Sequence, residues 1–328
     1  MGIYIAKRLL YMIPTLFGMS LISFVIIQLP PGDFLTSLVS AIADSGQGLD
    51  RASIDRLTAL YGLDQPFYVQ YWNWISGIVF RGDFGWSFDW GQPVSRLLWD
   101  RMGITLLVSG LSLILIWLIA IPIGIYSAVR RYSAGDYIFT FIGFIGLAIP
   151  TFILALGLMY VSFTYFGLNV GGLFSPEYEG ARWSIAKFWD LLAHLWIPVV
   201  VVAISSTAAL IRVMRANLAD ELGKPYVTTA RAKGLSEFTL IMRYPVRIAL
   251  NPFVSTIGWV LPALISGVTI TAIVLNLPMA GPLLLRALVS QDMYLAGAFI
   301  LIMSVLTLIG MLISDILLAL LDPRIRYQ

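Results

Sequence analysis

Long apolar runs alternate with polar connections along most of this chain, and six runs are long enough to cross a lipid bilayer. A helix crosses the hydrocarbon core with roughly 20 apolar residues, because all its backbone hydrogen bonds close internally. The pattern therefore predicts an all-α integral membrane protein with six transmembrane helices. The predicted spans cover Leu9 to Leu29, Ile104 to Tyr126, Tyr137 to Tyr165, Leu191 to Ile211, Pro252 to Leu275 and Met293 to Ser314.

Prolines fall within or near the ends of these spans. Membrane helices tolerate proline better than soluble helices do, because neighbouring groups satisfy the freed backbone. Each of these prolines is expected to mark a kink. They are Pro14, Pro122, Pro150, Pro198 and Pro262.

The composition agrees with a chain whose main solvent is lipid, because 59% of the 328 residues are hydrophobic and 12% are charged. The net charge of +3 is too small to indicate a nucleic-acid partner. The chain has no cysteine and one histidine, His194, so neither a disulfide framework nor a thiolate metal site is expected. Lys7 and Arg8 lead into the first run without a cleavage site, so this run is expected to stay as an anchor.

Lysine and arginine are concentrated on one side of the six-span arrangement, and this bias sets the orientation of a membrane protein. That side is predicted to be cytoplasmic, with both chain termini inside. Most of the acids, Asp292 among them, fall on the other side. The basic residues of the inner side are Lys7, Arg8, Arg130, Arg131, Arg212, Arg215, Lys224, Arg231, Lys233, Arg243, Arg247, Arg324 and Arg326.

Two connections are too long to be simple turns, and they set the predicted domain organisation. Residues 1–30 carry the first transmembrane helix, 31–103 form a small extracytoplasmic domain, and 104–328 form a core of five further helices. Within this core, a cytoplasmic segment at about 212–247 joins two spans. No soluble repeat or low-complexity tract divides the chain.

The predicted outer domain has helix signals and many aromatic residues. Ser53 is suited to cap a helix, Gly62 to stop it, and Pro66 to open the next one. The aromatics are suited either to bind a ligand or to form the domain's own core and a belt at the membrane surface, and the second interpretation is preferred. They include Tyr68, Tyr71, Trp72, Trp74, Phe84, Trp86, Phe88 and Trp90.

Residues typical of catalysis inside a membrane are scarce, so no catalytic residue and no metal site is predicted. Asp315 and His194 lie near opposite ends of their spans, too far apart in depth to cooperate. Asp315 is interpreted as a helix-end acid paired with a cytoplasmic arginine, and His194 as an interfacial hydrogen-bonding residue. The phosphate-binding pattern G-x-x-x-x-G-K-[ST] does not occur, so the chain is not expected to hydrolyse nucleotide by itself.

The cytoplasmic segment predicts two short helices joined by a glycine corner. Pro225 suits the first turn of a helix that continues from Tyr226 to Lys233, and Gly234 supplies a left-handed residue that ends it. Ser236 is suited to cap the next helix, which runs toward Pro245.

One face of the first short helix is predicted to carry small and polar residues, namely Tyr226, Thr229, Ala230 and Lys233. Small residues allow another protein to approach closely, so the segment is suited to fill a groove in a cytoplasmic partner. From the residues alone, a solvated surface hairpin without a partner is equally consistent.

Several stretches resemble one family of membrane transporters. YVTTARAKGLSEFTLIMRYPVRIALNP resembles the coupling segment of ABC-importer permeases. LLYMIPTLFGMSLISFVIIQLPPGD, YGLDQPFYVQYWNWISGIVFRGDFGWSF, IPIGIYSAVRRYS and LLDPRIRY resemble the dipeptide/oligopeptide/nickel permease family, and specifically the first of its two paired permease subunits. The matches run nearly end to end in the expected order.

This resemblance implies a type I ABC importer permease fold in a bacterial inner membrane, with peptides as cargo. The implied partners are a second homologous permease, two cytoplasmic ATP-binding subunits that hold ATP and Mg, and an extracytoplasmic solute-binding protein. This chain would hold no cofactor. The resemblance implies that an ATPase groove receives Tyr226, Thr229, Ala230, Arg231, Lys233, Gly234, Leu235 and Ser236.

The sequence departs from the family pattern at two places. Thr228, Thr229 and Ala230 stand where a Glu-Ala-Ala-like triplet is usual, and NLPMAGP, from Asn276 to Pro282, lacks the acid usual before that loop. The second difference leaves oligosaccharides, opines and nickel chelates as alternative cargoes. An ATPase-independent channel or membrane scaffold is the alternative of a different class.

Overall fold

The computed structural model describes residues 2–28, 64–168, 171–258, 263 and 267–321. The chain divides into two compact units, and each is described by itself. The first unit comprises Met1–Ile5, Ile104–Pro278 and Thr307–Gln328, and the second comprises Ala6–Gly103 and Met279–Leu306. The long helices α5 (Val94–Val129) and α15 (Met293–Leu321) contribute turns to both units.

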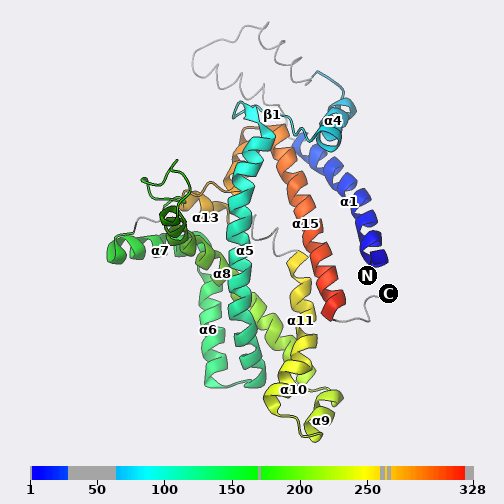
Figure 1. Ribbon diagram of the computed structural model, residues 1–328, viewed down its shortest axis with the longest axis vertical. Coiled ribbons are helices and arrows are strands. Elements are labelled where there is room, and N and C mark those ends of the chain that lie inside the picture. The colour runs from blue at the N-terminus through cyan, green and yellow to red at the C-terminus, as the bar shows by residue number, and fades with distance from the viewer. Residues whose placement is uncertain (1, 29–63, 169–170, 259–262, 264–266, 322–328) are drawn as a thin grey trace. The chain divides into compact units, whose positions relative to one another are not determined.

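The first unit is a helical bundle organised around α8, which packs against α6, α7 and α11 (Figure 1). The buried face of α8 includes Val201, Leu210 and Met214, which form part of the apolar core. The remaining elements of this unit follow the order α6 (Ala134–Ala148), α7 (Thr151–Phe166), α8 (Ile185–Leu222), α9 (Pro225–Ala232), α10 (Glu237–Arg243), α11 (Pro245–Ser255) and α13 (Thr269–Val274).

Four helices of the described chain are long and apolar enough to cross a membrane, at Ile5–Val25, Val94–Val129, Ile185–Leu222 and Met293–Leu321. These helices confirm the predicted first, second, fourth and sixth spans. Pro14, Pro122 and Pro198 lie inside helices that continue through them. The predicted fifth span falls partly outside the described residues, which show α11 and α13 on either side.

The predicted third span is not one straight helix. Helix α6 ends at Ala148, α7 begins at Thr151, and the two are bent by 99°. The break has a local cause, because proline disfavours the helical conformation of the residue before it and lacks an N–H group. Ile149 accordingly has extended backbone (ψ 120°), and Pro150 becomes the N-cap of α7.

Close helix packing in the first unit depends on a glycine. A Cβ atom built on Gly124 of α5 would lie 2.6 Å from the Cβ of Met214 on α8. Small residues at such positions let membrane helices approach each other closely, where dispersion contacts and not water drive association. Gly124 therefore sets the distance between these two helices.

The second unit combines the first turns of α5 and α15 with several short elements. A small antiparallel hairpin pairs Trp86 with Pro93 and Ser87 with Gln92. The other elements are α1 (Gly2–Gln28), α4 (Phe67–Ser76), the π-helix η1 (Gly77–Arg81), β1 (Trp86–Ser87), β2 (Gln92–Pro93) and α14 (Ala280–Val289). Pro66 opens α4 as predicted, whereas Ser53 and Gly62 lie outside the described residues.

Most of the aromatic residues singled out between positions 68 and 90 are part of the core of the second unit. Tyr71 and Trp74 of α4 pack around Phe24 of α1, and the Tyr71 hydroxyl lies 2.8 Å from the Ser20 hydroxyl. Phe84 and Trp90 pack against a cluster built from α5, α14 and α15. Phe88 is also buried, whereas Tyr68, Trp72 and Trp86 are exposed.

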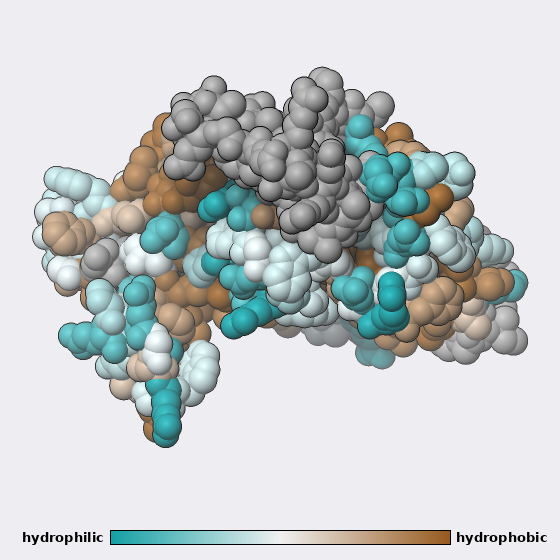
Figure 2. All heavy atoms as spheres, turned by 90° about the horizontal axis from the view of Figure 1, so that it is seen from above, coloured by the Kyte–Doolittle hydropathy of each residue, from teal (hydrophilic) through white to brown (hydrophobic). Residues whose placement is uncertain are grey.

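Many large apolar side chains of the described residues are exposed, and Figure 2 shows brown apolar areas beside polar ones on one face. On α6 the exposed residues include Tyr137, Phe141 and Ile142. A soluble chain would bury such side chains, because each costs free energy when it contacts water. Their exposure fits a protein whose helices face hydrocarbon.

Candidate functional site

The helical corner between α8 and α11, which we call the knuckle and define as residues 224–244, has the predicted local structure. Pro225 occupies the first turn of α9, and Gly234 has a φ of +78°, in the left-handed region. Ser236 is the N-cap of α10, but its hydroxyl donates to Thr239 Oγ1 at 2.8 Å and makes no bond to the backbone. The knuckle therefore turns at Gly234, between two short helices.

The end of α8 holds the start of the knuckle through Glu221. The hydroxyl of Tyr226 donates a 2.7 Å hydrogen bond to Glu221 Oε2, and Lys224 forms an ion pair with Oε1 of the same carboxylate. Glu221 is buried, so its charge requires these partners. Burial and the hydrogen bond to Glu221 raise the pKa of Tyr226, which keeps this hydroxyl a donor.

An ion pair spans the glycine corner. Arg231 Nε donates to Glu237 Oε1 at 2.5 Å, and its Nη2 donates to Oε2 at 3.2 Å. The hydrogen bond and the positive charge of Arg231 lower the pKa of Glu237, and the carboxylate in turn raises the pKa of Arg231. Both side chains are exposed, so the pair orients the corner more than it stabilises the fold.

The residues of the predicted contact face of α9 differ in their exposure. Ala230 is buried within this chain together with Val227, three positions earlier, and Tyr226 is half-buried. The other predicted residues lie at the surface: Thr229, Arg231, Lys233, Gly234 and Ser236 are exposed, and Leu235 is half-buried. Ala230 therefore packs α9 inward.

Val227 and Phe238 belong to the knuckle but were absent from the predicted set. Val227 is fully buried, and its i, i+3 spacing to Ala230 is the sequence signal for an inward-facing stripe. Phe238, on α10, is 77% exposed and is the most exposed large apolar side chain of the knuckle. An exposed aromatic next to the polar corner offers an apolar contact to a partner protein.

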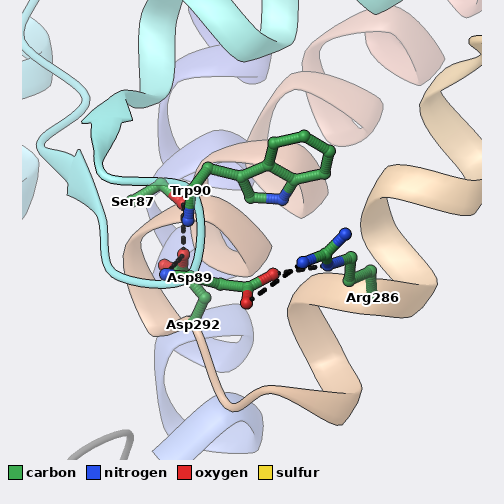
Figure 3. A network of polar contacts seen from close by, with 5 residues as sticks. All are labelled: Ser87, Asp89, Trp90, Arg286 and Asp292. Carbon is green, nitrogen blue, oxygen red and sulfur yellow. Dashed lines mark hydrogen bonds and ion pairs between the residues drawn. The ribbon is translucent and has the colours of Figure 1, made fainter.

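A second polar network joins the hairpin of the second unit to the connection between α14 and α15 (Figure 3). Asp292 is fully buried and accepts hydrogen bonds from the Ser87 hydroxyl at 2.5 Å and the Leu295 N–H at 3.1 Å. Burial raises the pKa of Asp292, while these hydrogen bonds oppose the rise. Asp292 acts as the N-cap of α15 and as an anchor of the hairpin.

Arg286 of α14 reaches the same hairpin. Its Nε donates to Asp89 Oδ2 at 2.6 Å, and its guanidinium lies 4.5 Å from the centre of the Trp90 ring (Figure 3). Sequence reasoning placed Asp292 on the outer side but did not identify these contacts. The residues lie about 200 positions apart, and no local pattern connects them.

The residues that the structure describes contain no group of three or more His, Cys, Asp or Glu side chains placed to hold a metal ion. His194 is buried in α8, where its Nδ1 lies 2.8 Å from the carbonyl oxygen of Asp190 one turn earlier. The histidine therefore has a hydrogen-bonding position within its own helix.

Helices of membrane-spanning length and a polar knuckle that continues from one of them are typical of a membrane permease subunit. The chain belongs to the family described as binding-protein-dependent transport system inner membrane component, which matches residues 120–327. The N-terminal component of the same family matches residues 1–109. Family membership thus covers nearly the whole chain and confirms the resemblance drawn from its motifs.

The curated relatives are similar over their full lengths. The oligopeptide transport system permease protein AppB of Bacillus subtilis is 37% identical over 328 residues, covering 100% of both chains. A putative peptide permease protein of Brucella ovis is 34% identical, covering 98% of both chains. The glutathione transport system permease protein GsiC of Escherichia coli K12 is 31% identical, covering 99% of both.

Proposed function

We propose that this chain is the first of two paired permease subunits in an ABC importer that takes up di- or oligopeptides. The observation that supports a role in coupling is the helical knuckle that follows α8. The proposal that the cargo is a peptide is supported by end-to-end similarity to proteins named as peptide permeases. ATP and Mg bind to two partner ATPase subunits. An extracytoplasmic binding protein delivers the peptide, and the chain itself performs no chemistry.

The knuckle is built to transmit force to the bundle. Helix α8 runs without interruption from Ile185 to Leu222, and Tyr226 and Lys224 bind the carboxylate near its end. Movement of α9 therefore moves α8, which packs against α6, α7 and α11. A ligand shifts an equilibrium only by its different affinity for the two states, and ATP bound between the partner subunits supplies that difference.

The contact surface for the ATPase consists of the exposed side of the knuckle. It includes Thr229, Arg231, Lys233, Gly234 and Ser236, with Leu235 partly accessible, and Phe238 extends it. Ala230 supports this surface from within, as does Tyr226 through Glu221. The proposed contact surface therefore lies in the predicted segment, but Ala230 and Tyr226 support it from within and do not themselves contact the ATPase.

The proposed topology follows the charge bias. The knuckle and both termini face the cytoplasm of a bacterial cell, six helices cross the inner membrane, and residues 31–103 form the extracytoplasmic domain. The hairpin and α14 then lie on the outer side, where the binding protein docks.

Site-directed labelling tests the orientation directly, because the chain contains no cysteine. Thr229→Cys on the knuckle and Trp72→Cys on α4 are both exposed positions. In intact cells an impermeant maleimide is expected to label Trp72→Cys, and Thr229→Cys only after the membrane is opened. Labelling of Thr229→Cys in intact cells would contradict the proposal.

Crosslinking and ATPase assays test the coupling. Thr229→Cys is expected to form a crosslink to an ATP-binding subunit in the purified complex, whereas Trp72→Cys forms none. In proteoliposomes, peptide-loaded binding protein is expected to stimulate ATP hydrolysis and peptide uptake together. Peptide uptake that proceeds without ATP would identify a channel. Stimulation of ATP hydrolysis by binding protein loaded with oligosaccharide, but not with peptide, would show that the cargo is a sugar.

A further inference from the structure

The first unit contains a groove between α6 and α8 that the proposed transport function does not use. The groove has a volume of about 170 Å³ and is lined by Phe139, Thr140, Gly143, Phe144, Ala208, Ile211, Arg212 and Arg215. The two helices approach each other closely at the groove, because a Cβ atom built on Gly143 of α6 would lie 3.1 Å from the Cβ of Ala208 on α8. Pockets for whole small molecules are usually about 300–1,000 Å³, so this groove suits part of a larger amphipathic molecule.

The two arginines of this groove differ in their partners. Arg215 Nη2 donates a 2.7 Å hydrogen bond to Asp136 Oδ2, and this buried carboxylate also accepts from the Tyr132 N–H at 2.9 Å. Arg212 is exposed, and its guanidinium lies 5.5 Å from the centre of the Phe144 ring. Among the described residues, no carboxylate lies within ion-pair distance of Arg212.

Arg215 leaves a further donor unused. Its Nε atom is buried and has no hydrogen-bond partner among the described residues. Of Arg212 and Arg215, only Arg215 is paired with a carboxylate of the described residues, that of Asp136, so this end of the groove has a net positive charge. Two further arginines, Arg130 and Arg131, lie just before Tyr132 in the connection that leads into α6. Guanidinium groups bind phosphate with paired N–H donors, which the exposed Arg212 supplies.

We propose that this groove binds an anionic phospholipid of the cytoplasmic leaflet, with its phosphate at Arg212 and Arg215 and an acyl chain along Phe139, Gly143 and Phe144. The charge pattern and the apolar lining match the two parts of such a lipid. Arg212 follows directly after the predicted span that ends at Ile211, which places it at headgroup depth. Basic pockets between helices on the cytoplasmic side are suited to anionic headgroups.

The leaflet assignment rests on the orientation in the proposed function, but the binding chemistry does not. The test uses the full-length chain in nanodiscs that contain phosphatidylcholine with or without phosphatidylglycerol. Native mass spectrometry is expected to show one retained phosphatidylglycerol, and thermal unfolding to shift upward with phosphatidylglycerol content. Neither measurement requires the ATPase subunits, so loss of transport coupling would leave this result unchanged.

Matched variants identify the site. Arg212→Gln is expected to weaken phosphatidylglycerol retention about fivefold, the factor for one basic side chain at a membrane surface. Arg212→Lys keeps the charge but not the paired donors, so its loss should be smaller. Arg243→Gln removes an exposed arginine from the knuckle and should retain the lipid as wild type does.

Three outcomes would overturn the proposal. Equal losses in Arg212→Gln and Arg243→Gln would indicate general surface attraction. Equal stabilisation by inorganic phosphate in phosphatidylcholine nanodiscs would assign the arginines to a free anion. Efficient crosslinking of Thr140→Cys to another polypeptide in native membranes, without any phosphatidylglycerol effect, would assign the groove to a neighbouring protein helix.

Discussion

The Ser87 hydroxyl donates a 2.5 Å hydrogen bond to the carboxylate of Asp292, which lies 205 positions later in the chain. The same carboxylate oxygen accepts from the Asp89 N–H at 3.3 Å, and the other oxygen accepts from Leu295 at the start of α15. Through one buried side chain, the hairpin before α5 and the N-terminus of α15 are held together.

Asp292→Ala is expected to destabilise the second unit by about 3 kcal/mol, because it leaves the donors of Ser87, Asp89 and Leu295 without an acceptor. Thermal unfolding in detergent measures the change. The control is Asp100→Asn, at an exposed position of the same unit, which should unfold like wild type. If Asp292→Ala unfolds at the same temperature as Asp100→Asn, Asp292 does not anchor the hairpin.

Gly234→Val is expected to distort the knuckle, because a β-branched residue at a φ of +78° costs about 1–2 kcal/mol. No atom lies within 4 Å of the position its Cβ would occupy, so the cost comes from the backbone alone. In the reconstituted complex, stimulation of ATPase activity should fall while the chain remains inserted.

The matched control for this substitution is Gly223→Ala, at the C-cap of α8 just before the knuckle. Gly223 has a φ of −80°, and its added Cβ would make only an ordinary 3.7 Å contact. Coupling should therefore be retained in Gly223→Ala. Equal stimulation of ATPase activity in Gly234→Val and Gly223→Ala would show that the conformation at Gly234 is not needed for coupling.

Gly124→Ala is expected to destabilise the first unit by about 1–3 kcal/mol, because the added methyl group overlaps Met214. Gly110→Ala, on the same helix, adds its methyl group to open space and should be neutral or slightly stabilising. A difference in unfolding temperature between the two variants checks the close approach of α5 and α8. Identical temperatures would contradict it.

Acidification is expected to loosen the knuckle. Because Arg231 lowers the pKa of Glu237 below its ordinary value of 4.5, the ion pair contributes above that value and is lost as the pH falls through the lowered pKa. Hydrogen exchange of the 234–237 amides should therefore show an additional loss of protection in this range. Glu237→Gln removes the titrating group, and its protection should lack this step. The same step in Glu237→Gln would assign the transition to another group.

The predictions for this chain succeeded where a single segment decides the structure. Apolar runs located four spans, and Pro225 and Gly234 located both ends of α9. The burial of Ala230 could not be read from the sequence, because a face of α9 is buried or exposed only through the segments packed against it. The residue types of α9 are compatible with either face.

The sequence by itself determined the membrane class and the helical knuckle, because bilayer length, proline geometry and glycine freedom act over a few neighbouring residues. Three relationships were decided by the tertiary structure alone. Asp292 accepts a hydrogen bond from Ser87, Gly124 lies against Met214, and the guanidinium of Arg212 lies over the ring of Phe144. These relationships join segments far apart in the chain, and their partners are selected by packing and by the need to satisfy buried polar groups.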